Sequence, residues 1–78
     1  MPRFHLNLYN DVISLDEEGV DLPDLEAARD AAIVNIRDVM RDELVKGHIT
    51  LGHRVEIVNE RGRILATVFF RDAVTVED

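Results

Sequence analysis

The sequence predicts a two-layer α+β domain in which an antiparallel sheet of four strands, in the order ββαββ, has one long helix packed on one face. Three observations lead to this fold class. The first residues alternate between apolar and polar, the middle third repeats apolar residues at helical spacing, and the last third holds a long apolar run after a turn. The 78 residues make one domain, residues 1–78, small enough to be marginally stable without further support.

The N-terminal third is expected to form two strands and two turns. Residues 3–9 alternate in polarity and place apolar side chains on one face, at Phe4, Leu6 and Leu8. Asn10-Asp11 is a turn pair, after which residues 12–15 return as the second strand of a β-hairpin. Residues 16–19 form the next turn, where Gly19 can adopt positive φ, and the chain stays extended up to Pro23.

The middle of the chain predicts one helix of about twenty residues. Asp24 is the expected N-cap, and Gly47 is placed to end the helix. The i, i+3, i+4 spacing defines an apolar stripe formed by Leu25, Ala28, Ala32, Ile33, Ile36, Val39 and Met40. Arg29 and Glu43 fall at the edge of this stripe, where their stems can cover apolar surface.

The last third predicts a second hairpin that turns at residues 59–62. Asn59 followed three residues later by Gly62 favours a type I turn with a glycine bulge, which is a three-residue loop. That register puts Val55, Ile57, Leu65, Thr67 and Phe69 on one face, and Val58, Ile64, Ala66, Val68 and Phe70 on the other. A four-residue loop would instead pair Ile57 with Ile64 and exchange the faces of the second strand. Residues 72–78 are expected to be a frayed tail.

The final strand is apolar on both faces, although only one face of the sheet can lie under the single helix. An exposed apolar patch usually marks an interface, and the absence of cysteine removes disulfides as a means of support. We therefore expect a homodimer. The candidate self-association residues are Ile64, Val68, Phe69 and Phe70.

Acidic residues dominate one segment and account for the formal net charge of −7. Eight acids and a single base, Arg29, lie between Asp11 and Asp30. Such a segment repels phosphate backbones, so nucleic acid is an unlikely partner, whereas a basic protein fits. The carboxylates without an evident role in the fold are the candidate partner-binding residues Asp16, Glu17, Glu18 and Asp21.

Catalytic and metal-binding patterns are not found. The acidic run does not have the spacing of an EF-hand, and the three histidines, His5, His48 and His53, are too scattered for a histidine-rich zinc site. The one serine, Ser14, lies in a predicted strand without an adjacent base. Arg54, Arg61, Arg63 and Arg71 are interleaved with acids, which favours cross-strand ion pairing over nucleic-acid binding. We therefore expect no enzymatic activity, cofactor or metal.

Four segments are distinctive in combination: the opening Met-Pro-Arg-Phe-His-Leu, Asp16-Glu-Glu-Gly, the stretch from Leu22 to Arg29 and the stretch from Gly62 to Arg71. Together they resemble a family of small alphaproteobacterial proteins of unknown function. The resemblance covers nearly the whole chain and implies a stand-alone domain, without implying an activity. The Glu18-Gly19 turn and Leu22-Pro23 are also similar, more loosely, to the antitoxin of the HicA–HicB toxin–antitoxin type, although the usual residues between the proline and the helix are missing.

These observations predict an interaction or regulatory domain that self-associates and has no catalytic activity. The alternative is an antitoxin-like domain whose acidic loop neutralises a basic nucleic-acid-binding partner. No apolar run approaches the roughly 18 residues that a membrane span needs, and the N-terminus lacks the apolar core of a secretory signal. We therefore expect a soluble cytoplasmic protein that has no contact with the membrane.

Overall fold

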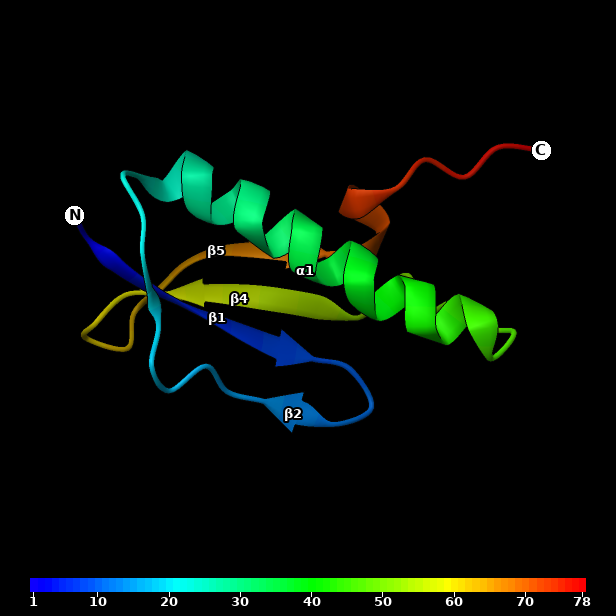
Figure 1. Ribbon diagram of the computed structural model, residues 1–78, viewed down its shortest axis with the longest axis horizontal. Helices are drawn as coiled ribbons and strands as arrows, with labels where there is room; N and C mark the ends of the chain where they lie inside the picture. The colour runs from blue at the N-terminus through cyan, green and yellow to red at the C-terminus, as the bar shows by residue number, and fades with distance from the viewer.

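The computed structural model describes residues 1–78 as a curved antiparallel sheet with one long helix along one face (Figure 1). The elements in chain order are β1 (Arg3–Tyr9), β2 (Ile13–Ser14), β3 (Val20–Asp21), α1 (Leu25–Val45), β4 (Arg54–Val58), β5 (Ile64–Phe69) and the 3₁₀ helix η1 (Phe70–Ala73). One helix and an antiparallel sheet confirm the α+β class. The length and apolar character that a membrane span requires are found in no helix of the chain.

The sheet has five strands where the sequence predicts four. Its order is β2-β1-β4-β5, and β3 also pairs with β1. Strands β2 and β3 occupy successive parts of the same edge, since β2 pairs with Leu8 and Tyr9 whereas β3 pairs with Arg3 and Phe4. Between these pairings, three residues of β1 face the five residues 15–19, which bulge out of the ladder. We call residues 15–19 the edge bulge.

Helix α1 begins and ends where the sequence predicts. The Asp24 carboxylate accepts a hydrogen bond from the Ala27 amide at 2.8 Å, and Gly47 takes φ +88° after the last turn. The apolar stripe packs against the inner side of β1, β4 and β5 to make the core. Eleven buried residues form that core, namely Phe4, Ala28, Ala32, Ile36, Met40, Val55, Ile57, Ala66, Val68, Phe70 and Ala73.

The second hairpin has the predicted turn, but the predicted faces of β5 are wrong. Asn59 closes the three-residue loop through its amide, which donates to the Arg63 carbonyl at 2.9 Å, and Gly62 has φ +80°. Beyond this turn a bulge at Leu65 shifts the register, so that Ile57 faces Ala66 and Val55 faces Val68. Val55 and Ile57 therefore share the core face with Ala66 and Val68. The bulge exchanges the two faces of β5, as a four-residue loop would also have done.

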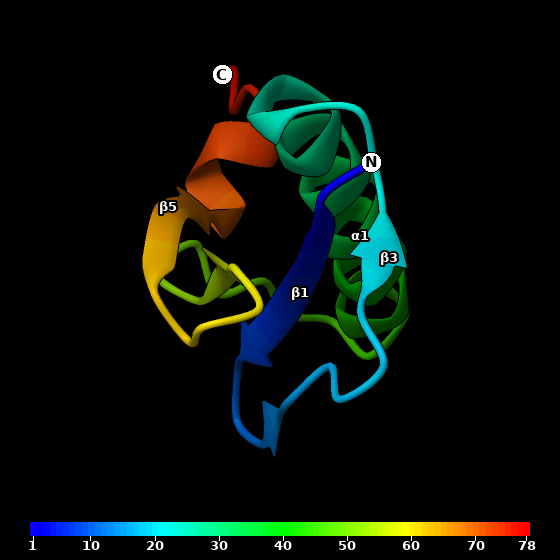
Figure 2. The ribbon, with the colours of Figure 1, turned by 90° about the vertical axis from the view of Figure 1, so that its left-hand side faces the viewer.

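The C-terminal segment begins with an ordered turn, so the predicted tail starts too early. Helix η1 extends to Ala73, which is buried with Phe70 against α1. Asp72 accepts a hydrogen bond from the Phe69 amide at 2.9 Å, and Arg37 of α1 donates to the Ala73 carbonyl at 2.9 Å. Figure 2 shows η1 beside α1 above β5. Of the predicted tail, residues 74–78 alone lie outside regular structure.

The other face of the sheet is not covered by the helix, and we call it the open face. Cross-strand partners point to the same face, so the register assigns one row to Tyr9, Arg54 and Phe69. A second row consists of His5, Val58 and Ile64. On the β2 side, Ile13 stands beside Tyr9. The open face thus mixes polar residues in its centre with apolar residues along both flanks.

Candidate functional site

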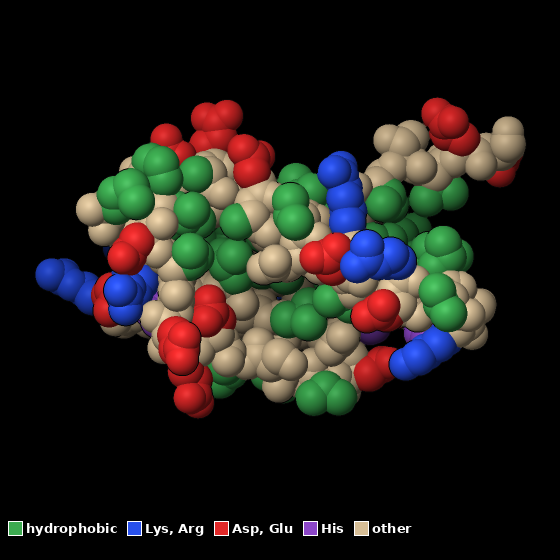
Figure 3. All heavy atoms as spheres, in the orientation of Figure 1, with side chains coloured by type: hydrophobic (Ala, Val, Ile, Leu, Met, Phe, Trp, Pro, Cys, Tyr) green, Lys and Arg blue, Asp and Glu red, His purple; other side chains and the backbone are tan.

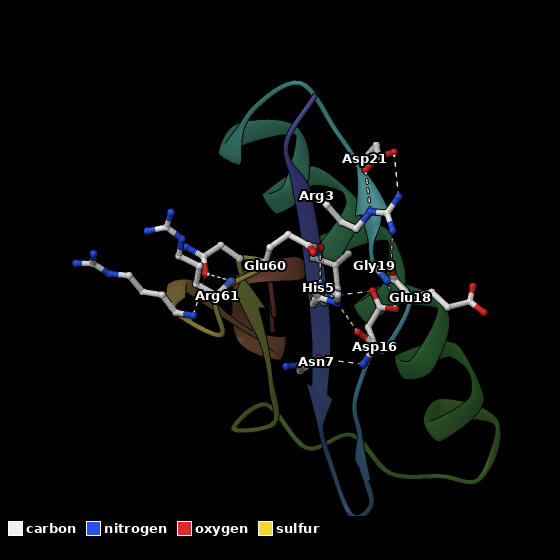
Figure 4. A network of polar contacts seen from close by, with 12 residues as sticks. Arg3, His5, Asn7, Asp16, Glu18, Gly19, Asp21, Glu60 and Arg61 are labelled. Atoms are coloured by element: carbon white, nitrogen blue, oxygen red, sulfur yellow. Dashed lines mark hydrogen bonds and ion pairs between the residues drawn. The ribbon is translucent and has the colours of Figure 1, made fainter.

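Asp16 holds the edge bulge against β1 by replacing the missing ladder partners. Its Oδ2 accepts from the Leu6 amide at 3.2 Å, and its Oδ1 accepts from the Gly19 amide at 3.0 Å. The Asp16 amide in turn donates to Oδ1 of Asn7 at 2.9 Å. A backbone amide at an interrupted sheet edge needs an acceptor, and the carboxylate supplies it. Figure 4 shows these contacts converging on one side of β1.

Asp21 is engaged by Arg3. The guanidinium donates from Nε to Oδ1 at 3.0 Å and from Nη2 to Oδ2 at 3.4 Å, and its Nη1 donates to the Glu18 carbonyl at 3.3 Å. The hydrogen bond from Arg3, followed by the Coulomb attraction of its charge, lowers the pKa of Asp21 and raises the pKa of Arg3. This pair ties β3 to the start of β1.

His5 bridges the edge bulge and the β4–β5 turn (residues 59–62). Its Nδ1 lies 2.6 Å from the Asp16 carbonyl oxygen, and its Nε2 lies 2.9 Å from Oε1 of Glu60. Both partners are acceptors, so both ring nitrogens donate when the ring is protonated. The hydrogen bond to the Asp16 carbonyl, and then the one to Glu60, raise the pKa of His5.

Gly19 allows these side chains to pack closely. It has φ +76°, and a Cβ atom there would lie 2.9 Å from Cγ of Arg3 and 3.0 Å from Cε1 of His5. Backbone geometry and close contact therefore both require glycine at this position.

The four acidic candidates divide into two kinds. Asp16 and Asp21 are held by contacts within the chain, whereas Glu17 and Glu18 are exposed and their carboxylates contact no hydrogen-bonding or ionic partner. A groove of about 340 Å³ lies on the open face between the edge bulge and the β4–β5 turn, bounded by Glu17 and Glu60. In Figure 3 acidic side chains gather over the segment between β2 and β3.

The sequence did not single out His5 or Glu60 as parts of this site. A usable signal exists, because the alternation of residues 3–9 puts His5 on the polar face. Opposite it lies Val58, immediately before the turn that carries Glu60. Their contact spans 55 residues of sequence, so only the pairing of β1 with β4 brings them together.

A second polar cluster forms where the helix ends. Nδ1 of His53 is buried without a hydrogen-bond partner, 3.7 Å from Oε1 of Glu43, and its Nε2 lies 3.7 Å from Oδ1 of Asp11. The Glu43 side chain is itself buried, and its Oε2 accepts from the Thr50 amide at 3.3 Å. A cleft of about 330 Å³ opens beside Asp11 and Glu43. The structure contains no group of three or more histidine or acidic side chains that could hold a metal ion.

The self-association candidates also divide into two kinds. Ile64 is 54% exposed and Phe69 is 37% exposed, both on the open face. Val68 and Phe70 lie in the core and cannot contact a partner without unfolding the domain. The shift at Leu65 turns Val68 toward the helix, and Phe70 is buried because it begins η1, which packs against α1.

Two of the four basic residues of the second hairpin, Arg54 and Arg71, stack on aromatic rings. The Arg54 guanidinium lies 4.4 Å from the Tyr9 ring centroid and donates from Nε to Oε2 of Glu56 at 3.1 Å. Arg71 lies 5.5 Å from the Phe69 ring centroid. The predicted cross-strand ion pairing is wrong for these residues, because the ion pair of Arg54 is with Glu56 of its own strand. Stacking instead holds Arg54 and Arg71 against aromatic rings of the open face.

The model of one protein family, domain of unknown function DUF6894, matches residues 3–71. The chain belongs to this family. The match confirms the resemblance to a small family of unknown function and runs from the start of β1 into η1. Neither the search of curated proteins nor the search of solved structures finds a match for this DUF6894 domain.

Proposed function

We propose that this DUF6894 domain is a non-catalytic interaction domain that self-associates through the open face of its sheet. The observation that carries the proposal is that Ile64 and Phe69 remain exposed on a face that the helix does not cover. Ile13, on the opposite flank of this face, is exposed as well. Exposed apolar groups at the two margins of a sheet face suit contact with another sheet.

A second copy of the chain is the partner that the size of the domain favours. Only 13 of the 78 residues are buried, and no disulfide supports the core. Full burial of an apolar side chain contributes about 1.5–3 kcal/mol, and these side chains are already partly covered. Association costs at least about 4 kcal/mol in lost translational and rotational freedom. We therefore expect a weak dimer whose population depends on the protein concentration.

Sedimentation equilibrium over an approximately hundred-fold concentration range tests this proposal. The wild-type domain should change from monomer to dimer, whereas Ile64→Lys and Phe69→Lys should stay monomeric and folded. Val34→Lys is the matched control, because Val34 is an exposed apolar residue on the outer side of α1. A wild-type domain that stays monomeric throughout, or a dimer that both open-face variants retain, would refute the proposal.

The absence of catalytic activity is part of the same proposal. His5 is the best-placed ionisable group on the open face, and both of its ring nitrogens already face acceptors within the chain. While both contacts are made, the ring offers no free nitrogen to a bound substrate. We also place the domain in the cytoplasm, which its lack of cysteine supports.

A second candidate function is the binding of a basic protein by the edge bulge, as an antitoxin-like domain would do. The observation that favours it is that Glu17 and Glu18 are unpaired on a segment that Asp16 holds in place. A segment held in this way presents its carboxylates to a cationic partner without first having to order its backbone.

Charge reversal tests this second function. A basic protein that copurifies with the wild-type domain should be lost from Glu17→Lys/Glu18→Lys. It should be retained by Glu77→Lys/Asp78→Lys, which changes the net charge equally in the C-terminal segment. Equal loss from both variants would show that only net charge matters and would remove the edge bulge as the site.

A further inference from the structure

We propose that His5 is a proton-operated latch that joins the edge bulge to the β4–β5 turn when it is protonated and releases the turn when it is neutral. The ring spans the two segments across the groove of the open face (Figure 4). This inference concerns a conformational device and is independent of self-association and of any basic partner.

The two contacts of the ring require two protons. Nδ1 faces a carbonyl oxygen and Nε2 faces a carboxylate oxygen, and neither oxygen can donate. A neutral imidazole carries one N–H, so one nitrogen must then present its lone pair to an acceptor. One of the two contacts is therefore lost on deprotonation.

The contact with Glu60 is the one that opens. The Asp16 carbonyl is the closer partner, at 2.6 Å against 2.9 Å, and it belongs to a segment that the Asp16 carboxylate fixes to β1. The Glu60 side chain is 61% exposed and can turn into solvent. The neutral ring should thus keep its proton on Nδ1 and let the β4–β5 turn move.

Other charged groups surround the ring on every element packed near it. They are Arg3 on β1, Asp16, Glu17 and Glu18 on the edge bulge, Asp21 on β3, and Glu60, Arg61 and Arg63 around the turn. Arg3 is neutralised by Asp21, and the Asp16 carboxylate accepts from backbone amides beside the ring. The hydrogen bond to the Asp16 carbonyl, then the hydrogen bond to Glu60, and after them the charges of Glu60 and Asp16 raise the pKa of His5.

The direction of the pH dependence follows. A raised pKa in the folded state means that the latch is fully formed below the ordinary histidine value of 6.5 and is lost as pH rises through the folded value. Deprotonation removes the positive charge of the ring and frees Glu60 across the groove from Glu17, so the rim of the groove becomes more negative at high pH.

Proton and nitrogen NMR titration of the intact domain tests the latch, with the His5 signals assigned through His5→Gln. We expect a His5 midpoint above 6.5, and we expect the amides of residues 59–62 to titrate with the same midpoint. After correction for the intrinsic pH dependence of exchange, the protection of the amides in the turn should fall about five-fold above the midpoint, as expected for the loss of one ordinary hydrogen bond. The neutral ring should be the Nδ1–H tautomer.

Glu60→Gln is the matched variant, because Glu60 is exposed and the change removes only its charge. It should lower the His5 midpoint and reduce the pH response of the turn, whereas Glu17→Gln, on the other side of the groove, should change the response of the turn little. The proposal would be overturned if the amides of residues 59–62 did not respond to the ionisation of His5. It would also be overturned if the neutral ring carried its proton on Nε2.

Discussion

Removal of the Asp16 carboxylate should weaken the fold more than any other change in the acidic run. In Asp16→Ala the amides of Leu6 and Gly19 lose their acceptor at the sheet edge. A hydrogen bond to a charged group contributes about 1.5–3 kcal/mol, and water can replace part of it at this half-exposed site. We therefore expect a loss of about 2–3 kcal/mol in the free energy of unfolding, from a total of about 4–12 kcal/mol for a domain of this size.

Urea unfolding followed by circular dichroism measures this loss directly. The midpoint should fall while the slope stays constant, because the surface exposed on unfolding is nearly unchanged. Asp16→Asn keeps one carbonyl oxygen and should lose about half as much. Hydrogen exchange should accelerate at Leu6 and Gly19, the two amides that the carboxylate accepts from.

Glu17→Ala provides the control for these measurements. Its carboxylate is exposed and contacts no partner, so the change should stay within about 0.5 kcal/mol. The reasoning would be refuted if Asp16→Ala and Glu17→Ala had equal midpoints, since Asp16 would then be an ordinary solvated acid.

Three further substitutions probe other parts of the fold by the same urea assay. Gly19→Ala should lose about 1–2 kcal/mol because of its positive φ and its contact with Arg3, whereas Gly52→Ala, with no atom nearer than 3.9 Å, should be close to neutral. Asp24→Ala should lose about 1 kcal/mol as the N-cap of α1, and a smaller loss than in Glu17→Ala would contradict that role. Phe70→Ala should lose about 3–5 kcal/mol, and retained wild-type stability would show that η1 does not close the core.

The helix and the first strand could be predicted from the sequence because their signals are local. Asp24 and Gly47 mark the two ends of α1, and the apolar stripe between them has the helical period. The alternation in residues 3–9 likewise assigns its own faces. Each of these signals depends on residues within a few positions of one another, where chain sterics decide the outcome.

The faces of β5 could not be predicted, because the strand is apolar on both sides and has no period-two signal. The bulge at Leu65 decides which side reaches the core, and it arises from the pairing with β4. The fifth strand escaped prediction for a related reason. Val20 and Asp21 form only two pairs, and they do so with the part of β1 that β2 leaves free.

The acidic run shows why a charge without an evident local role is a weak indication of a binding site. Asp16 and Glu17 are adjacent and both acidic, yet only Asp16 lies opposite the amide of Leu6. A variant with the charges of all these acids reversed could lose its partner either because the binding site is gone or because the sheet edge is damaged. A test for a basic partner must change Glu17 and Glu18 and leave Asp16 intact. Likewise, a test for self-association must use Phe69 and avoid Phe70, whose replacement by aspartate would place a charge in the core.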